Sequence, residues 1–279
     1  MFLLRDMEES LRNSGAYRVF TERDPETGEI IVYGEPRREA PTPEWGVVIG
    51  DIVHNLRSAL DHMVWALTVA NGNAPPAVIP KGKAGKPWRD ISFPIYTDPY
   101  PTDHGGKLIP WSQSKEPQSL WGIDPSLRAD FESLQPFMSR GNPGLIQLGT
   151  EDPSYAPLAI LHNLWNIDKH RHLHLTVFTV GYKDLFGPPT SPQTPGGVNR
   201  LNFAPNPRGS FEGRTEFGRL SWDGGPVPTE VARRLNPSVF FDIAFEDGPP
   251  VYGGRVTQTL DGLFYEVQRI LQRFEQHLA

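Results

Sequence analysis

The sequence has no cysteine at all. Disulfide bonds, thiolate metal ligands and cysteine nucleophiles are therefore excluded. It also has no apolar run of membrane-spanning length, and acidic residues appear from Asp6 on, too soon for a secretory signal. A positive net charge is lacking too, because the chain carries a net charge of −6, which argues against a broad surface for nucleic acid. We expect a cytoplasmic protein with no membrane partner, in which any basic site is local.

The chain does have enough apolar material for a core, because 38% of its 279 residues are hydrophobic. Strand-like and helix-like stretches are segregated along the sequence, which predicts an α+β fold rather than a dinucleotide-binding one. We expect one α+β domain over residues 1–279, in which a helical bundle carries an antiparallel β-sheet. The expected helices cover about 44–71, 124–134, 155–171 and 254–279, and the expected strands lie in about 172–246 and in an N-terminal hairpin over 17–34.

Two nine-residue stretches far apart in the chain share the pattern H-N-L-x5-H. One runs from His54 to His62 and the other from His162 to His170. Four of the eight histidines lie at these matching ends, which is not the distribution expected for histidines scattered over a protein surface. The repeated pattern therefore predicts a polar site between two helices.

The first of these stretches lies in a helix whose faces separate cleanly at about 100° per residue. One side of this helix is apolar. The other side has neither Lys nor Glu, the residues that usually fill a solvated helix face. This polar stripe favours a polar cleft or a contact with another chain, and it consists of Asp51, His54, Asn55, Ser58, Asp61, His62 and Trp65, with Arg57 at its edge.

Arg57 and His62 have the R-x4-H spacing of the HEPN ribonucleases, and the stretch from Arg57 to His62 resembles their helical signature. The resemblance implies a HEPN-like bundle and metal-independent cleavage of RNA, in which Arg57 steadies the scissile phosphate and His62 transfers a proton. A guanidinium group matches phosphate, and an imidazole titrates near neutral pH. HEPN sites are usually completed across a dimer, so the resemblance also implies a possible homodimer, although the second motif helix could take the partner's place.

The ribonuclease hypothesis assigns further roles to polar residues of both motifs. The additional catalytic or orienting candidates are Asp61, His54, Asn55 and His170. The substrate-binding candidates, some of which would supply a local positive field for RNA, are Lys169, Arg171, Ser58 and Asn166.

A metal site is the second hypothesis for the same helices. His54 and His62 are separated by about 12 Å along a helix, so both cannot bind one ion from the same straight helix. One ion would need one end of each motif, with ligands drawn from Asp51, His54, His62, His162 and His170. Such a set of imidazoles and carboxylates suits Zn, Mn or Fe.

The third hypothesis is a binding or structural protein without catalysis, in which buried His and Asn side chains form a polar seam between the helices. A wider resemblance does not decide among the three. The order of Gly50-Asp51, His54 to His62, Trp65, Phe93-Pro94-Ile95, Leu134-Gln135-Pro136-Phe137 and Asn166 to Arg171 resembles a widespread family of uncharacterised bacterial proteins. This resemblance covers about residues 45–175 and implies that both motif helices belong to one domain.

Overall fold

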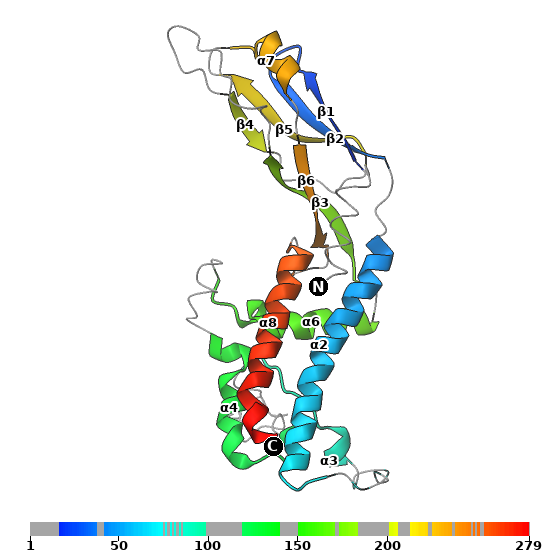
Figure 1. Ribbon diagram of the computed structural model, residues 1–279, viewed down its shortest axis with the longest axis vertical. Helices are drawn as coiled ribbons and strands as arrows, with labels where there is room; N and C mark the ends of the chain where they lie inside the picture. The colour runs from blue at the N-terminus through cyan, green and yellow to red at the C-terminus, as the bar shows by residue number, and fades with distance from the viewer. Residues whose placement is uncertain are drawn as a thin grey trace, which may run out of the picture. The chain divides into compact units, whose positions relative to one another are not determined.

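The computed structural model confirms the predicted α+β class (Figure 1). It describes residues 17–37, 42–74, 76, 79, 81, 84, 86–98, 119–139, 150–170, 173–183, 201–205, 213–222, 225–235, 238–246, 248, 250–251 and 254–278. Among these residues, no helix is both long and apolar enough to cross a membrane.

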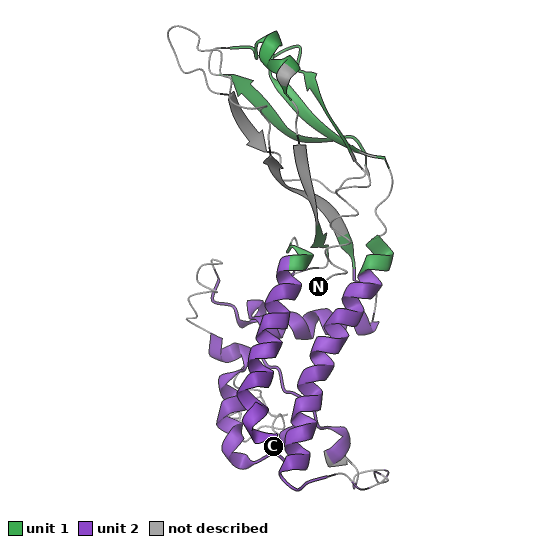
Figure 2. Ribbon diagram, viewed as in Figure 1, with its two compact units in different colours: residues 1–45, 174–247, 253–257 green, residues 46–173, 248–252, 258–279 purple. Residues whose placement is uncertain are grey.

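The chain divides into two compact units (Figure 2). We call residues 1–45, 174–247 and 253–257 the sheet unit, and residues 46–173, 248–252 and 258–279 the helical unit. Each unit is made of stretches that are distant in the sequence. The predicted strands belong to the sheet unit, and most of the residues of the predicted helices belong to the helical unit.

The sheet unit contains a four-stranded antiparallel sheet in the order β1-β2-β5-β4. Its strands are β1 (Tyr17–Arg23), β2 (Ile30–Pro36), β4 (Leu201–Pro205) and β5 (Thr215–Trp222). A separate antiparallel pair joins β3 (Leu175–Lys183) to β6 (Ser238–Phe245), and a short helix, α7, spans Thr229–Arg234. The N-terminal hairpin and the antiparallel pairing are thus confirmed, with the strands distributed over two sheets.

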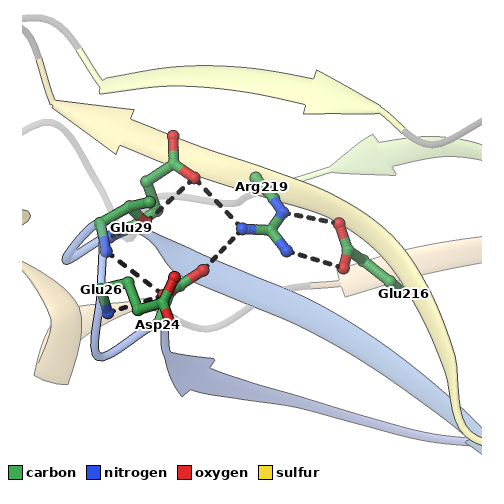
Figure 3. Close-up of polar contacts among 6 residues, drawn as sticks. Asp24, Glu26, Glu29, Glu216 and Arg219 are labelled. Atoms are coloured by element: carbon green, nitrogen blue, oxygen red, sulfur yellow. Dashed lines mark hydrogen bonds and ion pairs between the residues drawn. The ribbon is translucent and has the colours of Figure 1, made fainter.

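The turn of the hairpin is fixed by an ionic network that reaches β5 (Figure 3). Asp24 accepts hydrogen bonds from the backbone N–H groups of Glu26 and Thr27, which shapes the turn. Arg219 donates to both carboxylate oxygens of Glu216 and, through Nη1 at 2.7 Å, to Asp24. These contacts raise the pKa of Arg219 and lower that of Asp24, so one guanidinium group ties a local turn to a strand distant in sequence.

A glycine in β2 makes room for an aromatic ring from β5. The ring of Phe217 lies directly over Gly34, where a Cβ atom would be 1.7 Å from the ring atom Cζ. Phe217 is 1% exposed and therefore belongs to the core of the sheet unit, together with Val32 and Leu220.

The helical unit is built around three helices, α2 (Thr42–Ala70), α6 (Pro157–His170) and α8 (Val256–Phe274). Shorter elements are α3 (Lys86–Arg89), η4 (Pro125–Leu127), α4 (Arg128–Ser133), η5 (Pro136–Ser139), η6 (Pro153–Tyr155) and η7 (Glu275–His277). Asp124 caps η4 by accepting from the N–H group of Ser126, as its position before a proline predicts. The end of α8 packs beside α4, where the rings of Phe274 and Phe131 stack with centroids 4.7 Å apart.

The predicted apolar side of α2 forms part of this core. Its most buried members are Ile49, Val53, Leu60 and Val64, all fully enclosed. Spacings of four and seven residues place them on one face of a helix, which explains why this face is covered.

Two glycines near the start of α2 let α6 come close. A Cβ atom on Gly50 would be 2.1 Å from Oδ1 of Asp168, and one on Gly46 would be 2.8 Å from the carbonyl oxygen of Leu173. α6 runs crosswise to α2 (Figure 1), so its second half and the residues after it lie against the first turns of α2. This close crossing brings the two H-N-L motifs together.

A buried glutamine holds the segment after α3 in place. Gln135 is 1% exposed, and its Nε2 donates to the carbonyl oxygens of Pro94 and Phe131 at 3.0 Å each. Its Oε1 accepts from the N–H group of Tyr96 at 3.1 Å. All the polar atoms of this side chain are therefore engaged, and they fix residues 94–96 without a regular ladder of hydrogen bonds.

Replacing Gln135 by glutamate should lower the free energy of unfolding by about 2 kcal/mol, because an ionised carboxylate cannot donate the two hydrogen bonds to Pro94 and Phe131. Urea denaturation followed by circular dichroism measures this change. The matched control is Gln268→Glu on the exposed side of α8, which should change stability by less than about 0.5 kcal/mol. Equal effects of the two substitutions would contradict a specific role for Gln135.

Candidate functional site

Arg57 and Asp61, one turn apart on α2, clamp the backbone of Phe93. Nη2 of Arg57 donates to the Phe93 carbonyl oxygen at 2.6 Å, and Oδ1 of Asp61 accepts from the Phe93 N–H group at 2.8 Å. The same Nη2 and Oδ1 atoms form an ion pair at 3.1 Å. Both backbone groups of Phe93 are thereby satisfied by two side chains that also neutralise each other.

Arg57 is buried, being 5% exposed, whereas the helical projection placed it at the edge of the polar stripe. The projection treats α2 alone, whereas other parts of the helical unit contact this side chain. Burial lowers the pKa of Arg57 and raises the pKa of Asp61, and the attraction between the two groups opposes both shifts. In this buried position, the two charged groups are stabilised by their attraction for each other and by hydrogen bonds rather than by hydration.

The indole ring of Trp165 on α6 lies close to two cationic side chains. The guanidinium carbon of Arg57 lies 5.4 Å from the centroid of its ring, and Nζ of Lys169 lies 3.9 Å from it. The imidazole of His162 lies one helical turn before Trp165, with ring centroids 6.0 Å apart. We call Arg57, Asp61, His162, Trp165 and Lys169 the α2–α6 site.

Three buried nitrogen atoms of this site have no hydrogen-bond partner within the part of the chain that the structure describes. They are Nε and Nη1 of Arg57 and Nδ1 of His162. Burial lowers the pKa of His162, and the positive charges of Arg57 and Lys169 lower it further. Buried polar atoms are normally paired, so these three need an explanation.

The exposed residues of the predicted site lie on the outer side of α2 and at the end of α6. His54, Asn55, His62, Asp51, Lys169 and His170 are exposed, whereas Ser58, Asp61, His162 and Asn166 are half-buried. The imidazoles of His62 and His54 lie within electrostatic reach of the Asp61 carboxylate and oppose the rise of its pKa. Arg171 lies outside the described residues.

Within the described ranges, no cluster of possible metal ligands supports the metal hypothesis. No group of three or more His, Asp or Glu side chains there is placed to hold one metal ion. Of the four motif histidines, only His162 is half-buried; His54, His62 and His170 are exposed.

Sequence reasoning missed three partners of the site, namely Trp165, Phe93 and Gln135. Phe93 and Gln135 lie in stretches that the family resemblance singled out, and Trp165 lies in the second H-N-L motif. The structure connects these stretches physically through Arg57, Asp61 and the Gln135 hydrogen bonds. The co-occurrence of these short motifs was the available signal, but it could not specify which atoms meet.

Comparisons with protein-family models, with curated proteins and with solved structures found no match. A functional assignment therefore rests on the side chains of α2 and α6 themselves. Their chemistry combines a buried guanidinium group, two of whose nitrogens have no partner among the described residues, with a half-buried imidazole and two exposed imidazoles near a carboxylate. Such a set suits the binding of phosphate and the transfer of protons.

Proposed function

We propose that this protein is a metal-independent ribonuclease or phosphodiesterase that acts at the α2–α6 site. The observation that carries the proposal is the pair of buried Arg57 nitrogens without a partner among the described residues. A phosphate oxygen would satisfy such donors, and a guanidinium group is well suited to this anion. α6 would take the place that a second copy of the chain takes in a HEPN dimer.

In the proposed reaction, His62 removes the proton of a ribose 2′-hydroxyl group or protonates the departing 5′-oxygen. The 2′-oxygen forms a bond to phosphorus while the bond from phosphorus to the 5′-oxygen breaks, so the proton lost at one oxygen is balanced by the proton gained at the other. Support for His62 comes from its exposure and from its proximity to the Asp61 carboxylate. His54, on the same carboxylate, is the second candidate for proton transfer.

A non-catalytic structural role is the second candidate function, and one observation favours it. Arg57 and Asp61 already satisfy both backbone groups of Phe93, which is what a polar seam that holds a segment in place would do. If the role is structural, substitutions at the site change the stability of the protein and no activity is lost.

His62→Ala should reduce cleavage of single-stranded RNA by at least about a hundredfold, the usual contribution of a general acid or base. The assay uses highly purified protein in excess EDTA, so that a metal-dependent reaction is suppressed at the same time. His277→Ala, which removes another exposed imidazole of the helical unit, is the control and should leave cleavage unchanged.

Melting temperatures of both variants separate the two candidate functions. His62→Ala protein that is folded and inactive supports the ribonuclease. RNA cleavage that is equal in wild type and His62→Ala, or absent from both, would refute it and leave the structural role. Activity that EDTA abolishes would point to the metal-dependent enzyme instead.

A further inference from the structure

The three unpartnered nitrogens of Arg57 and His162 come from two helices that cross at this point. Within the described residues, Arg57 donates one hydrogen bond, from Nη2 to the Phe93 carbonyl oxygen, and its Nε and Nη1 have no partner. Nδ1 of His162 is buried as well, although the residue is half-buried as a whole. A buried N–H group or ring nitrogen without a hydrogen-bond partner favours the binding of any ligand that can form a hydrogen bond with it.

The charges around these atoms favour an anion. Arg57 from α2 and Lys169 from α6 both act on His162 as positive charges. Asp61 is the carboxylate nearest to Arg57 along α2, and it is already engaged by Phe93 and by Nη2. An oxyanion that enters here would therefore meet the two Arg57 nitrogens that have no partner in the described part of the chain, an ammonium group and an imidazole.

The indole of Trp165 lies against this group of charges. It contacts Arg57 and Lys169 through its ring and lies next to His162 on α6. Trp165 is half-buried, whereas the Arg57 nitrogens beside it are buried. A side chain that reaches solvent can move aside more readily than one in the core, so the half-buried Trp165 can yield to a ligand more readily than Arg57 can.

We propose that Arg57 and His162 form a binding site for a terminal phosphate group, with Trp165 as its movable cover. This inference deepens the proposed function and rests on it for the identity of the ligand as an RNA end. A phosphate at an RNA end has a nucleotide on one side only, so it can reach the buried Arg57 nitrogens with less displacement of the surrounding side chains than an internal phosphodiester needs. A terminal phosphate extends beyond the last sugar and can be inserted alone.

The first test is the binding of inorganic phosphate, measured by isothermal titration calorimetry. His162→Gln should weaken binding about tenfold, which corresponds to the loss of one charge-assisted hydrogen bond. Trp165→Ala should strengthen binding by several-fold, because the phosphate no longer has to displace the indole. His277→Gln is the matched control and should bind phosphate as wild type does.

The second test uses a 2′-O-methyl RNA oligonucleotide, which cannot be cleaved through its 2′-oxygen. Copies with a 5′-phosphate, with a 3′-phosphate and with neither are compared, so that the end which is recognised is identified. We expect one phosphorylated end to bind at least tenfold more tightly than the unphosphorylated oligonucleotide, and this preference to disappear in Arg57→Lys and His162→Gln.

The two proposals can fail separately. Equal binding of the three oligonucleotides, or binding of inorganic phosphate that His162→Gln does not change, overturns the terminal-phosphate site even if RNA is cleaved. Binding that follows the expected pattern in a protein that does not cleave RNA supports the site and removes only the proposed reaction. Because His162→Gln keeps the Arg57 clamp intact, a folding defect in an Arg57 variant does not obscure the result.

Discussion

Replacing Arg57 by alanine is expected to lower the free energy of unfolding of the helical unit by about 3 kcal/mol. The substitution leaves the half-buried Asp61 carboxylate without its cation and the Phe93 carbonyl oxygen without its donor. It also removes the guanidinium group that lies over Trp165. Urea denaturation followed by circular dichroism measures the loss, and hydrogen exchange of residues 91–96 locates it.

Two further variants show whether the loss comes from the clamp. Arg57→Ala combined with Asp61→Asn should recover part of the stability, because a neutral amide needs no cation and its oxygen still accepts from the Phe93 N–H group. Arg269→Ala, which breaks an exposed ion pair with Glu266 on α8, should cost less than about 0.5 kcal/mol. An Arg57→Ala protein as stable as Arg269→Ala would show that the clamp contributes nothing.

Gly34→Ala is expected to lower the free energy of unfolding of the sheet unit by about 3 kcal/mol, at the upper end of the usual cost of overpacking. The added methyl group would lie 1.7 Å from Cζ of Phe217, whose ring is enclosed and has no free direction in which to move. Hydrogen exchange of β2 and β5 measures the loss directly in the affected strands.

Phe217, whose ring the added methyl group would overlap, provides a test of this explanation. In the Phe217→Leu background, Gly34→Ala should cost less than it does in the wild type, because the smaller side chain leaves room for the methyl group. The control is Gly262→Ala on α8, where an added Cβ meets nothing within 4 Å. That substitution should stabilise the helix by about 0.5–1 kcal/mol, so a similar loss at both glycines would contradict steric crowding at Gly34.

Local patterns were sufficient to predict the three long helices and the hairpin, but not α3 or α7, which lies within the range expected to be strands. The apolar spacing in α2 depends only on neighbours within the helix, and the predicted positions Ile49, Val53 and Leu60 are buried. Likewise, the turn between Asp24 and Glu29 forms through contacts within six residues of sequence. Arg219, which lies 195 positions after Asp24, also binds this turn. The local sequence around neither residue could predict this contact.

The candidate site was predicted less well for the same reason. The motifs did indicate that α2 and α6 meet, but the environment of Arg57 depends on Phe93, 36 residues away in sequence, and on Trp165. A helical projection places a residue on a face without showing what covers that face. His54 and His62 therefore fell on the same predicted stripe as Asp61, although they are exposed and Asp61 is half-buried.

The interleaved course of the chain has a consequence for synthesis on the ribosome. Phe131 completes its ring stack with Phe274, but α8 is translated after every strand of the sheet unit (Figure 1). While those strands are being made, the nascent helical unit lacks α8 and leaves the apolar surface around Phe131 uncovered. Exposed apolar surface of this kind is what chaperones bind. We therefore expect nascent chains that extend to residue 247 to associate with chaperones, and chains that extend through α8 to be released.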